Sequence, residues 1–202
     1  MEISALVLAA GASQRMPGQN KLLLPLGAKT IIAHTVDHLL QSKAGEVIVV
    51  LGHDAETVQR ALSGREVVFT TNPDFAQGLS TSIIAGLQAA SKSARGFLIS
   101  LGDQPLVTFP ELNLLMQCFT YAGDYSIIAP VYRGRRGNPV IFDRSHLPEM
   151  LAISGDAGCK AIIARHAQRV VEVEMQTDHV LRDVDTFQSY ETMQARLNQP
   201  KK

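Results

Sequence analysis

The stretch Leu6–Lys21 of the chain reads LVLAAGASQRMPGQNK. An apolar run ends abruptly at Gly11, and a loop of small residues follows, closed by the cations Arg15 and Lys21. A buried strand that ends in such a loop exposes backbone N–H groups beside fixed positive charge, an arrangement that holds phosphate groups. The loop has neither the three glycines of a dinucleotide fingerprint nor the Gly-Lys-Ser/Thr of a Walker loop. It therefore predicts a different polyphosphate-binding loop, with an ordinary strand-to-helix turn as the alternative.

The size and composition of the chain limit the function classes that it can belong to. Its 202 residues, 46% of them apolar, favour one domain over residues 1–202 with a sizeable core. Its formal net charge is zero, so neither nucleic acid nor an anionic membrane is expected as a partner. Cys118 and Cys159 match no disulfide framework or metal spacing. Without a signal peptide or an apolar run near the ~18 residues of a membrane span, we expect a cytoplasmic protein with reduced thiols.

Short β-branched runs alternate with amphipathic segments along most of the chain. The spacing of apolar residues predicts strands over residues 3–10, 46–51, 66–70, 96–101, 125–129, 139–142 and 169–174. It predicts helices over residues 30–41, 55–62, 79–90, 110–121, 157–165 and 186–197. This alternation indicates an α/β fold, a Rossmann-like three-layer α/β/α sandwich with a mostly parallel sheet. Ligands of such folds bind at the carboxyl ends of the strands.

A carboxylate stands at the end of the fourth predicted strand. Asp103 follows Gly102 and lies two residues before Pro105, so its side chain is held rigidly at the edge of the sheet. Mg²⁺ prefers one or two carboxylates, with water and phosphate oxygens completing its octahedron. Asp103 is therefore a candidate magnesium ligand, and a turn or helix cap is the alternative.

Two further carboxylates occur near the C-terminus. Asp183 and Asp185 share one face if their segment is extended, because a spacing of two returns a strand to the same side. Asp185 and Thr186 also precede a predicted helix, so capping competes with metal binding at this segment.

The loop after the third predicted strand combines small and hydroxyl-bearing residues. Asn72 follows the strand, Gly78 permits close backbone approach, and Ser80 and Ser82 offer hydroxyls at the start of a helix. Such a loop can read the edge of a nucleotide base, whereas simple capping by Ser80 is the alternative.

The regular alternation loosens after about Pro130. A basic cluster of Arg133, Arg135 and Arg136 beside Asn138 predicts a β-hairpin over the rim, either a solvated tip or a site for a second phosphorylated substrate. Farther on, Asp156 can cap the following helix and Lys160 can reach an anion.

One histidine pair has a spacing that can bind zinc. His34 and His38 lie at i and i+4 of a predicted helix, but no third ligand is evident, so we assign them no metal.

Taken together, these segments resemble the nucleotidyltransferase family that matures the molybdenum cofactor, and its cytidylyltransferase type most of all. The matching segments are residues 8–16, 21–23, 72–82, 102–105, 137–139, 155–158 and 183–186, in the order of the family. The first motif alone is shared with sugar-nucleotide and isoprenoid nucleotidyltransferases, whereas the combination is much more specific. The resemblance implies the fold of the nucleotide-diphospho-sugar transferases.

The resemblance also implies a reaction, the transfer of CMP from CTP to the terminal phosphate of molybdenum-loaded molybdopterin, with pyrophosphate released. Residues 1–105 would form the nucleotide-binding half and residues 106–198 the acceptor-binding half. The implied partners are CTP, a molybdopterin-type phosphorylated pterin and a recipient molybdoenzyme. Guanylyl transfer, another phosphorylated acceptor, and a non-catalytic nucleotide-binding cofactor chaperone are the alternatives.

Roles for individual residues follow from the same resemblance. The implied nucleotide-binding residues are Leu8, Ala9, Ala10, Gly11, Arg15, Lys21, Asn72, Gly78 and Ser82. Arg15, Lys21 and Asp103 would be catalytic, and Asp103 and Asp185 would hold Mg²⁺. Asn138, Asp156 and Lys160 would meet the acceptor.

Four positions distinguish this chain within the family pattern. Related guanylyltransferases have Gly where Ala10 stands and a different turn around Gln77, which favours CTP over GTP. Pro17 interrupts the first motif, and Lys160 replaces a common Arg, whose two-pronged phosphate grip a Lys cannot give.

Overall fold

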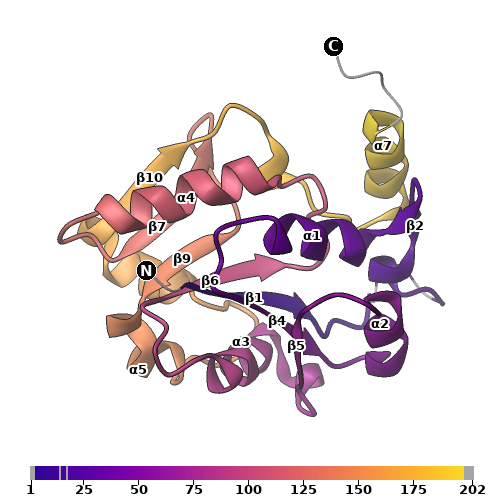
Figure 1. The fold of residues 1–202 in the computed structure, drawn as a ribbon, viewed down its shortest axis with the longest axis horizontal. Helices are drawn as coiled ribbons and strands as arrows, with labels where there is room; N and C mark the ends of the chain where they lie inside the picture. The colour runs from indigo at the N-terminus through magenta and orange to yellow at the C-terminus, as the bar shows by residue number, and fades with distance from the viewer. Residues whose placement is uncertain (1–2, 14, 17, 198–202) are drawn as a thin grey trace.

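The computed structural model describes residues 3–13, 15–16 and 18–197, so Pro17 lies outside the described residues. The main sheet has eight strands in the order β10-β7-β9-β6-β1-β4-β5, with β8 paired to β7 (Figure 1). Its strands are β1 (Ile3–Ala9), β4 (Glu46–Leu51), β5 (Val68–Thr71), β6 (Gly96–Leu101), β7 (Ile127–Tyr132), β8 (Arg135–Arg136), β9 (Val140–Asp143) and β10 (Val170–Glu174). A separate hairpin pairs β2 (Pro25–Leu26) with β3 (Lys29–Thr30).

Helices cover both faces of this sheet. On these faces lie α1 (Ile31–Leu40), α2 (Ala55–Ala61), α3 (Leu79–Ala89), α4 (Phe109–Tyr121), α5 (Leu147–Met150) and α6 (Lys160–Arg165), whereas α7 (Phe187–Leu197) packs beside the β2–β3 hairpin. Successive residues of β1 point to opposite faces, because the side chains of a strand alternate. Val7 joins the apolar core under α1, α2 and α4, whereas Leu6 joins the core over α3, α5 and α6 (Figure 1). The predicted three-layer α/β/α sandwich is confirmed.

The direction of one strand differs from simple alternation. β9 runs antiparallel to both β6 and β7, while β1, β4, β5 and β6 are mutually parallel and β7 is parallel to β10. The predicted hairpin after Pro130 is confirmed, since β7 and β8 pair antiparallel. Three predicted elements have bounds that were wrong by two or more residues: β5 begins at Val68 and not at residue 66, β7 runs over Ile127–Tyr132 and not over residues 125–129, and α6 begins at Lys160 and not at residue 157.

The first strand-end loop is braced by its neighbour. The backbone N–H of His53 donates to the carbonyl of Ala10 over 3.1 Å, and a Cβ on Gly52 would lie 2.6 Å from the Cβ of Ala10. Only glycine fits this contact without a shift. Asp54 precedes α2 with a left-handed backbone, and its side chain makes no capping hydrogen bond to that helix.

The C-terminal helix carries a distant segment to the first loop. Met193 of α7 and Val184 share an apolar cluster with Met16 and Leu26, beside the β2–β3 hairpin. The hydroxyl of Thr186 accepts the N–H of Ser189 at the start of α7, so the expected cap there is Thr186 rather than Asp185. Among the described residues, no helix is both long and apolar enough to cross a membrane.

Candidate active site

A cavity of about 430 Å³ opens at the carboxyl edge of the parallel strands. Its walls come from strand-end loops of both halves of the chain: Leu8, Ala10, Gly11, Ala12, Lys21, Leu22, Phe75, Ala76, Gly78, Leu79, Ser82, Leu101, Asp103 and Asp156. Its size and position suit a small-molecule ligand of an open α/β sheet.

A carboxylate cluster lies at one end of this cavity and is bridged by two cations. The Lys21 Nζ lies 2.5 Å from Asp103 Oδ2 and 2.7 Å from Asp185 Oδ1. The exposed Arg15 donates from Nη1 to Asp185 Oδ2 over 2.7 Å. The carbonyl of Asp103 accepts the N–H of Val184 over 3.0 Å, which fixes the two carboxylate segments relative to each other. Four predicted residues from three parts of the chain therefore meet here.

The position of Lys21 is set by local backbone contacts. The side chain of Asn20 accepts the N–H of Leu22 and begins the 3-10 turn η1 (Lys21–Leu23). The Lys21 N–H donates to Ser13 Oγ over 3.0 Å, which ties the turn back to the first loop. The ammonium is thus held at the cavity by a short, capped segment.

Burial and charge act together on these groups. Burial raises the pKa of Asp103 above its ordinary value, against the attraction of Lys21, and the neighbouring Asp183 and Asp185 raise it further. Burial alone would lower the pKa of Lys21, but the two carboxylates that it bridges outweigh burial and raise it. Lys21 is therefore a fixed positive charge at neutral pH.

The cluster has the donors that a hard divalent cation prefers. Asp103, Asp183 and Asp185 each offer a carboxylate oxygen, and these oxygens lie within 4.8 Å of one another. Asp103 Oδ1 is buried and has no hydrogen-bond partner among the described residues. An orphaned carboxylate oxygen is costly to bury. The residues present therefore fit a cation such as Mg²⁺. The resemblance assigned no metal to Asp183, although its spacing from Asp185 carried the signal.

The predicted nucleotide-binding residues divide into two groups. Leu8, Ala10 and Gly11 line the cavity, whereas Ala9 faces the apolar core under α1. Gly78 and Ser82 also line it. Asn72 is only 2% exposed and lies outside the cavity wall. Its amide donates to Thr81 and Ser82 and its carbonyl accepts from Asp74, so its side chain braces the loop.

Asp156 caps a different helix from the one expected. Its Oδ1 accepts the N–H of Leu79 over 3.2 Å, and the Gly155 carbonyl accepts the N–H of Ser80, so this loop caps α3. A Cβ on Gly78 would lie 2.7 Å from Asp156 Oδ1, which explains the need for glycine there. The expectations that Asp156 caps the following helix and that Ser80 caps α3 were wrong.

The other predicted acceptor residues lie outside the cavity wall. The Asn138 N–H donates to the carbonyl of Val180, which also accepts from Gln104 Nε2. Sequence reasoning assigned no role to Gln104 or Val180, which together join the 102–105 and 137–139 segments. Lys160 is exposed at the first position of α6.

The basic hairpin is solvated. Arg133, Arg135 and Arg136 are all exposed, and Arg136 pairs with Glu172 over 2.6 Å. In the part of the chain that the structure describes, none of these three arginines belongs to the cavity wall.

Residues 5–170 match the family model described as the MobA-like NTP transferase domain. The chain belongs to this family. The match extends over β1, the first loop, Asp103 and the segments around Asn138 and Asp156, and it ends before Asp183 and Asp185. The chain is therefore a nucleotidyltransferase by family, with a cavity at the expected edge of the sheet.

Full-length relatives and a solved structure agree with this family. The nicotine blue oxidoreductase of Paenarthrobacter nicotinovorans is 27% identical over 191 residues, which cover 92% of this chain and 93% of the relative. The molybdenum cofactor cytidylyltransferase of Escherichia coli K12 is 26% identical over 198 residues, 98% of each protein. A nucleotidyl transferase structure from Methanothermobacter superposes with a TM-score of 0.85 at 28% identity, covering 96% of this chain and 97% of that one.

Proposed function

We propose that this protein transfers CMP from CTP to the terminal phosphate of a molybdopterin-type pterin. A phosphate oxygen of the acceptor attacks the α-phosphorus, the bond to the β-phosphate oxygen breaks, and pyrophosphate leaves. The observation that carries the proposal is the Lys21–Asp103–Asp185 cluster at the mouth of the strand-end cavity. Support for the substrates comes from the relative in Escherichia coli, which is similar over 98% of its length.

The reaction needs little acid–base chemistry from the protein. A phosphate acceptor is already ionised at neutral pH, so positioning and charge neutralisation carry catalysis. Leu8, Ala10 and Gly11 would hold the nucleotide along the end of β1. Lys21 and Arg15 would neutralise the triphosphate. Both cations contact carboxylates here, so we propose that they exchange those partners for phosphate when substrate binds.

Mg²⁺ is the cofactor that we propose for this site. Asp103 and Asp185 would hold it, with Asp183 as a further ligand, because their oxygens converge and Asp103 Oδ1 is orphaned. When bound, the ion would neutralise charge on the triphosphate. Asp103 and Asp185 themselves keep Lys21 at the cavity until the phosphates arrive.

The acceptor half is proposed to act from the opposite wall. Asp156 lines the cavity and caps α3, so it would set the distance between the two halves of the site. Asn138 and Lys160 lie outside that wall, and we propose that they meet the part of the pterin that extends beyond it. A recipient molybdoenzyme would collect the product from this side.

Ala10 and Gln77 are proposed to favour CTP over GTP. Ala10 lines the cavity, and Gln77 lies between the lining residues Ala76 and Gly78 with its amide donating to Asp74 over 2.7 Å. Replacing Ala10 with Gly should move the CTP/GTP ratio of kcat/KM toward GTP by about ten-fold, the size of one missing carbon in a pocket.

Pyrophosphate release tests the proposal. The purified protein, Mg²⁺ and molybdenum-loaded molybdopterin are incubated with CTP, GTP, ATP or UTP in turn. We expect release with CTP above the others, and none without the pterin. Release with GTP in preference would contradict the assigned nucleotide, release with another phosphorylated acceptor alone would contradict the assigned pterin, and binding of CTP without release would indicate a chaperone. A redox reaction of the kind named for the Paenarthrobacter relative would release no pyrophosphate.

A further inference from the structure

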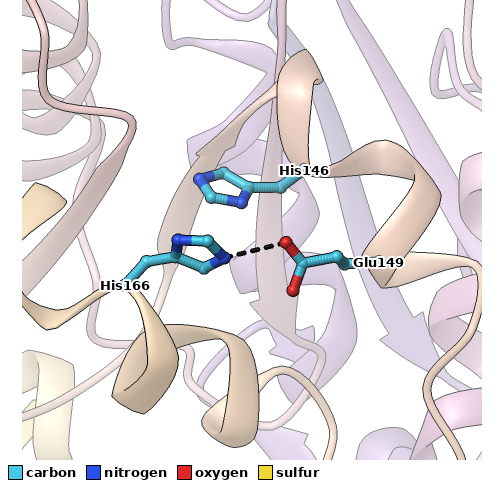
Figure 2. Close-up of side chains that lie close together, drawn as sticks. All are labelled: His146, Glu149 and His166. Atoms are coloured by element: carbon cyan, nitrogen blue, oxygen red, sulfur yellow. Dashed lines mark hydrogen bonds and ion pairs between the residues drawn. The ribbon is translucent and has the colours of Figure 1, made fainter.

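Three metal-ligating side chains meet at the amino edge of the sheet, opposite the cavity. Figure 2 shows His146, Glu149 and His166 pointing toward one another. β9 runs antiparallel, so Asp143 at its end pairs with Gly96, the first residue of β6. His146 ends the following turn, η3 (Arg144–His146), and directly precedes α5, so it lies at the edge where the parallel strands start. Figure 1 shows α5 near this edge. His166 reaches the same edge because it ends α6 shortly before β10.

His146 has one nitrogen satisfied and one directed at the cluster. The residue is 3% exposed, and its Nε2 lies 2.8 Å from the hydroxyl of the buried Ser126. Nδ1 makes no hydrogen bond to any described residue, and Figure 2 shows a ring nitrogen turned toward Glu149 and His166. Ser126 fixes the ring orientation by occupying Nε2. An outer partner on the second nitrogen is the usual support of a metal-ligating histidine.

The side chains of His166 and Glu149 already contact each other. His166 Nε2 lies 2.8 Å from Glu149 Oε1, and the two imidazole rings have centroids 4.7 Å apart. The ligand atoms of the three residues lie within 4.8 Å of one another. Ligands of tetrahedral Zn²⁺ stand about 3.3 Å apart at bond lengths of about 2.0–2.1 Å. Small side-chain rotations therefore suffice to enclose an ion.

Arg165 contacts the outer oxygen of Glu149. It pairs with Oε2 and is largely exposed, so the other oxygen, Oε1, faces His166. Zn²⁺ binds imidazole and carboxylate in their deprotonated forms, so the ion would replace the proton between His166 Nε2 and Glu149 Oε1.

We propose that His146 Nδ1, His166 Nε2 and Glu149 Oε1 bind a Zn²⁺ ion, with water in the fourth position. Two imidazoles and one carboxylate are a donor set that suits zinc and disfavours magnesium. The ion would fasten α5 to the end of α6 beneath β7 and β10. Because this edge lies away from the cavity, the site is independent of the proposed nucleotidyl transfer.

Metal titration of the untagged, chelator-treated protein tests the site. We expect one Zn²⁺ per chain bound outside the carboxylate cluster, and visible absorption of a nitrogen-ligated tetrahedral ion when Co²⁺ replaces it. The melting temperature should rise by about 5–10 °C at zinc concentrations 100-fold above Kd. His166→Gln should lower this zinc affinity at least about 100-fold while keeping an amide for Glu149.

Matched variants distinguish zinc binding at this site from zinc binding at other side chains of the protein. Glu149→Gln should also lose the ion, and it serves if His166→Gln folds poorly. His34→Gln, which removes an imidazole elsewhere, and Asp185→Asn, which alters the carboxylate cluster, should both retain it. The proposal would be overturned if His166→Gln and Glu149→Gln bound zinc with the same affinity as the wild type. It would also be overturned if Asp185→Asn alone lost the Co²⁺ absorption.

Discussion

Each of the two edges of the sheet gathers three side chains whose donor atoms could bind an ion, but the donor chemistry differs. At the carboxyl edge, Asp103, Asp183 and Asp185 supply oxygen donors, and Lys21 bridges two of them. At the amino edge, two imidazoles and Glu149 supply mostly nitrogen donors. Oxygen clusters suit Mg²⁺ that is shared with phosphate, whereas imidazole suits zinc.

The two clusters also differ in the partners that their charged and polar groups have when no ligand is bound. The carboxylates are neutralised by Lys21 and Arg15, cations that can turn to a triphosphate when it arrives. In the histidine cluster, each ring instead has one fixed polar partner, the hydroxyl of Ser126 for His146 and the carboxylate of Glu149 for His166. An edge with exchangeable partners suits turnover, and an edge with fixed partners suits a resident ion.

Replacing the bridging lysine should give a large effect at the carboxyl edge. Lys21→Met is expected to lower kcat/KM about 10²–10³-fold, equivalent to about 2.7–4 kcal/mol, because a preorganised charge is lost from the reacting phosphates. Steady-state pyrophosphate release measures it.

Lys29→Met is the matched control for this lysine. Lys29 pairs with Asp37 at the surface, where such a pair contributes little, so activity should be kept. Equal activity of the two variants would remove Lys21 from the mechanism.

The half-buried carboxylate of Glu111 links α4 to the segment that leads to Asp183. Burial alone would raise the pKa of Glu111, but hydrogen bonds from His179, Thr177 and Thr108 outweigh it and lower the pKa to about 2. The stabilisation is therefore complete above the ordinary value near 4.5 and is lost as the pH falls from there toward 2. We expect Glu111→Gln to cost about 3 kcal/mol at pH 7 and to flatten this pH dependence in urea unfolding.

The exposed Glu56 provides the comparison for Glu111. Glu56→Gln should leave both the urea midpoint and its acid dependence unchanged. An acid dependence that persists in Glu111→Gln would assign it to another group.

Replacing Gly137 with a larger residue should have a smaller effect on the carboxyl edge, through steric crowding. A Cβ on Gly137 would lie 2.2 Å from the carbonyl oxygen of Val180, so Gly137→Ala must push η5 (His179–Leu181) away. We expect a loss of about 1–3 kcal/mol in the free energy of unfolding, as for other overpacked sites, together with reduced activity.

Gly134 in the same hairpin separates crowding from backbone strain. Nothing lies within 4 Å of its missing Cβ, but its φ of +74° is left-handed, so Gly134→Ala should cost only about 1 kcal/mol and keep activity. Full activity of Gly137→Ala would uncouple η5 from the site.

The bounds of strands could be predicted best where an apolar run ends at a residue that breaks the strand. β4 and β6 have the predicted bounds, because each buried run ends at a glycine, Gly52 or Gly102. The direction of β9 could not be read, since periodicity reports burial and not strand direction. Asp103 and Asp185 were paired only through the family resemblance, and the structure brings them together through Lys21.

Contacts between segments far apart in the chain could not be predicted from the sequence. The Asp156 cap on Leu79 joins residues 77 positions apart, with no local signal at either end. The histidine cluster was missed for the same reason, because His166 follows Glu149 by 17 positions and depends on the antiparallel β9. His34 and His38 were the pair that the sequence could suggest, because their helical spacing is local.

Pyrophosphate release by two single variants tests the assignment of function to the edges most directly. Asp103→Asn and His166→Gln are assayed beside the wild type with CTP, Mg²⁺ and molybdenum-loaded molybdopterin, and each is checked for its fold by circular dichroism. We expect Asp103→Asn to lose at least about 100-fold in rate and His166→Gln to keep the wild-type rate. A folded Asp103→Asn protein that releases pyrophosphate at the wild-type rate would contradict the placement of the reaction at the carboxyl edge.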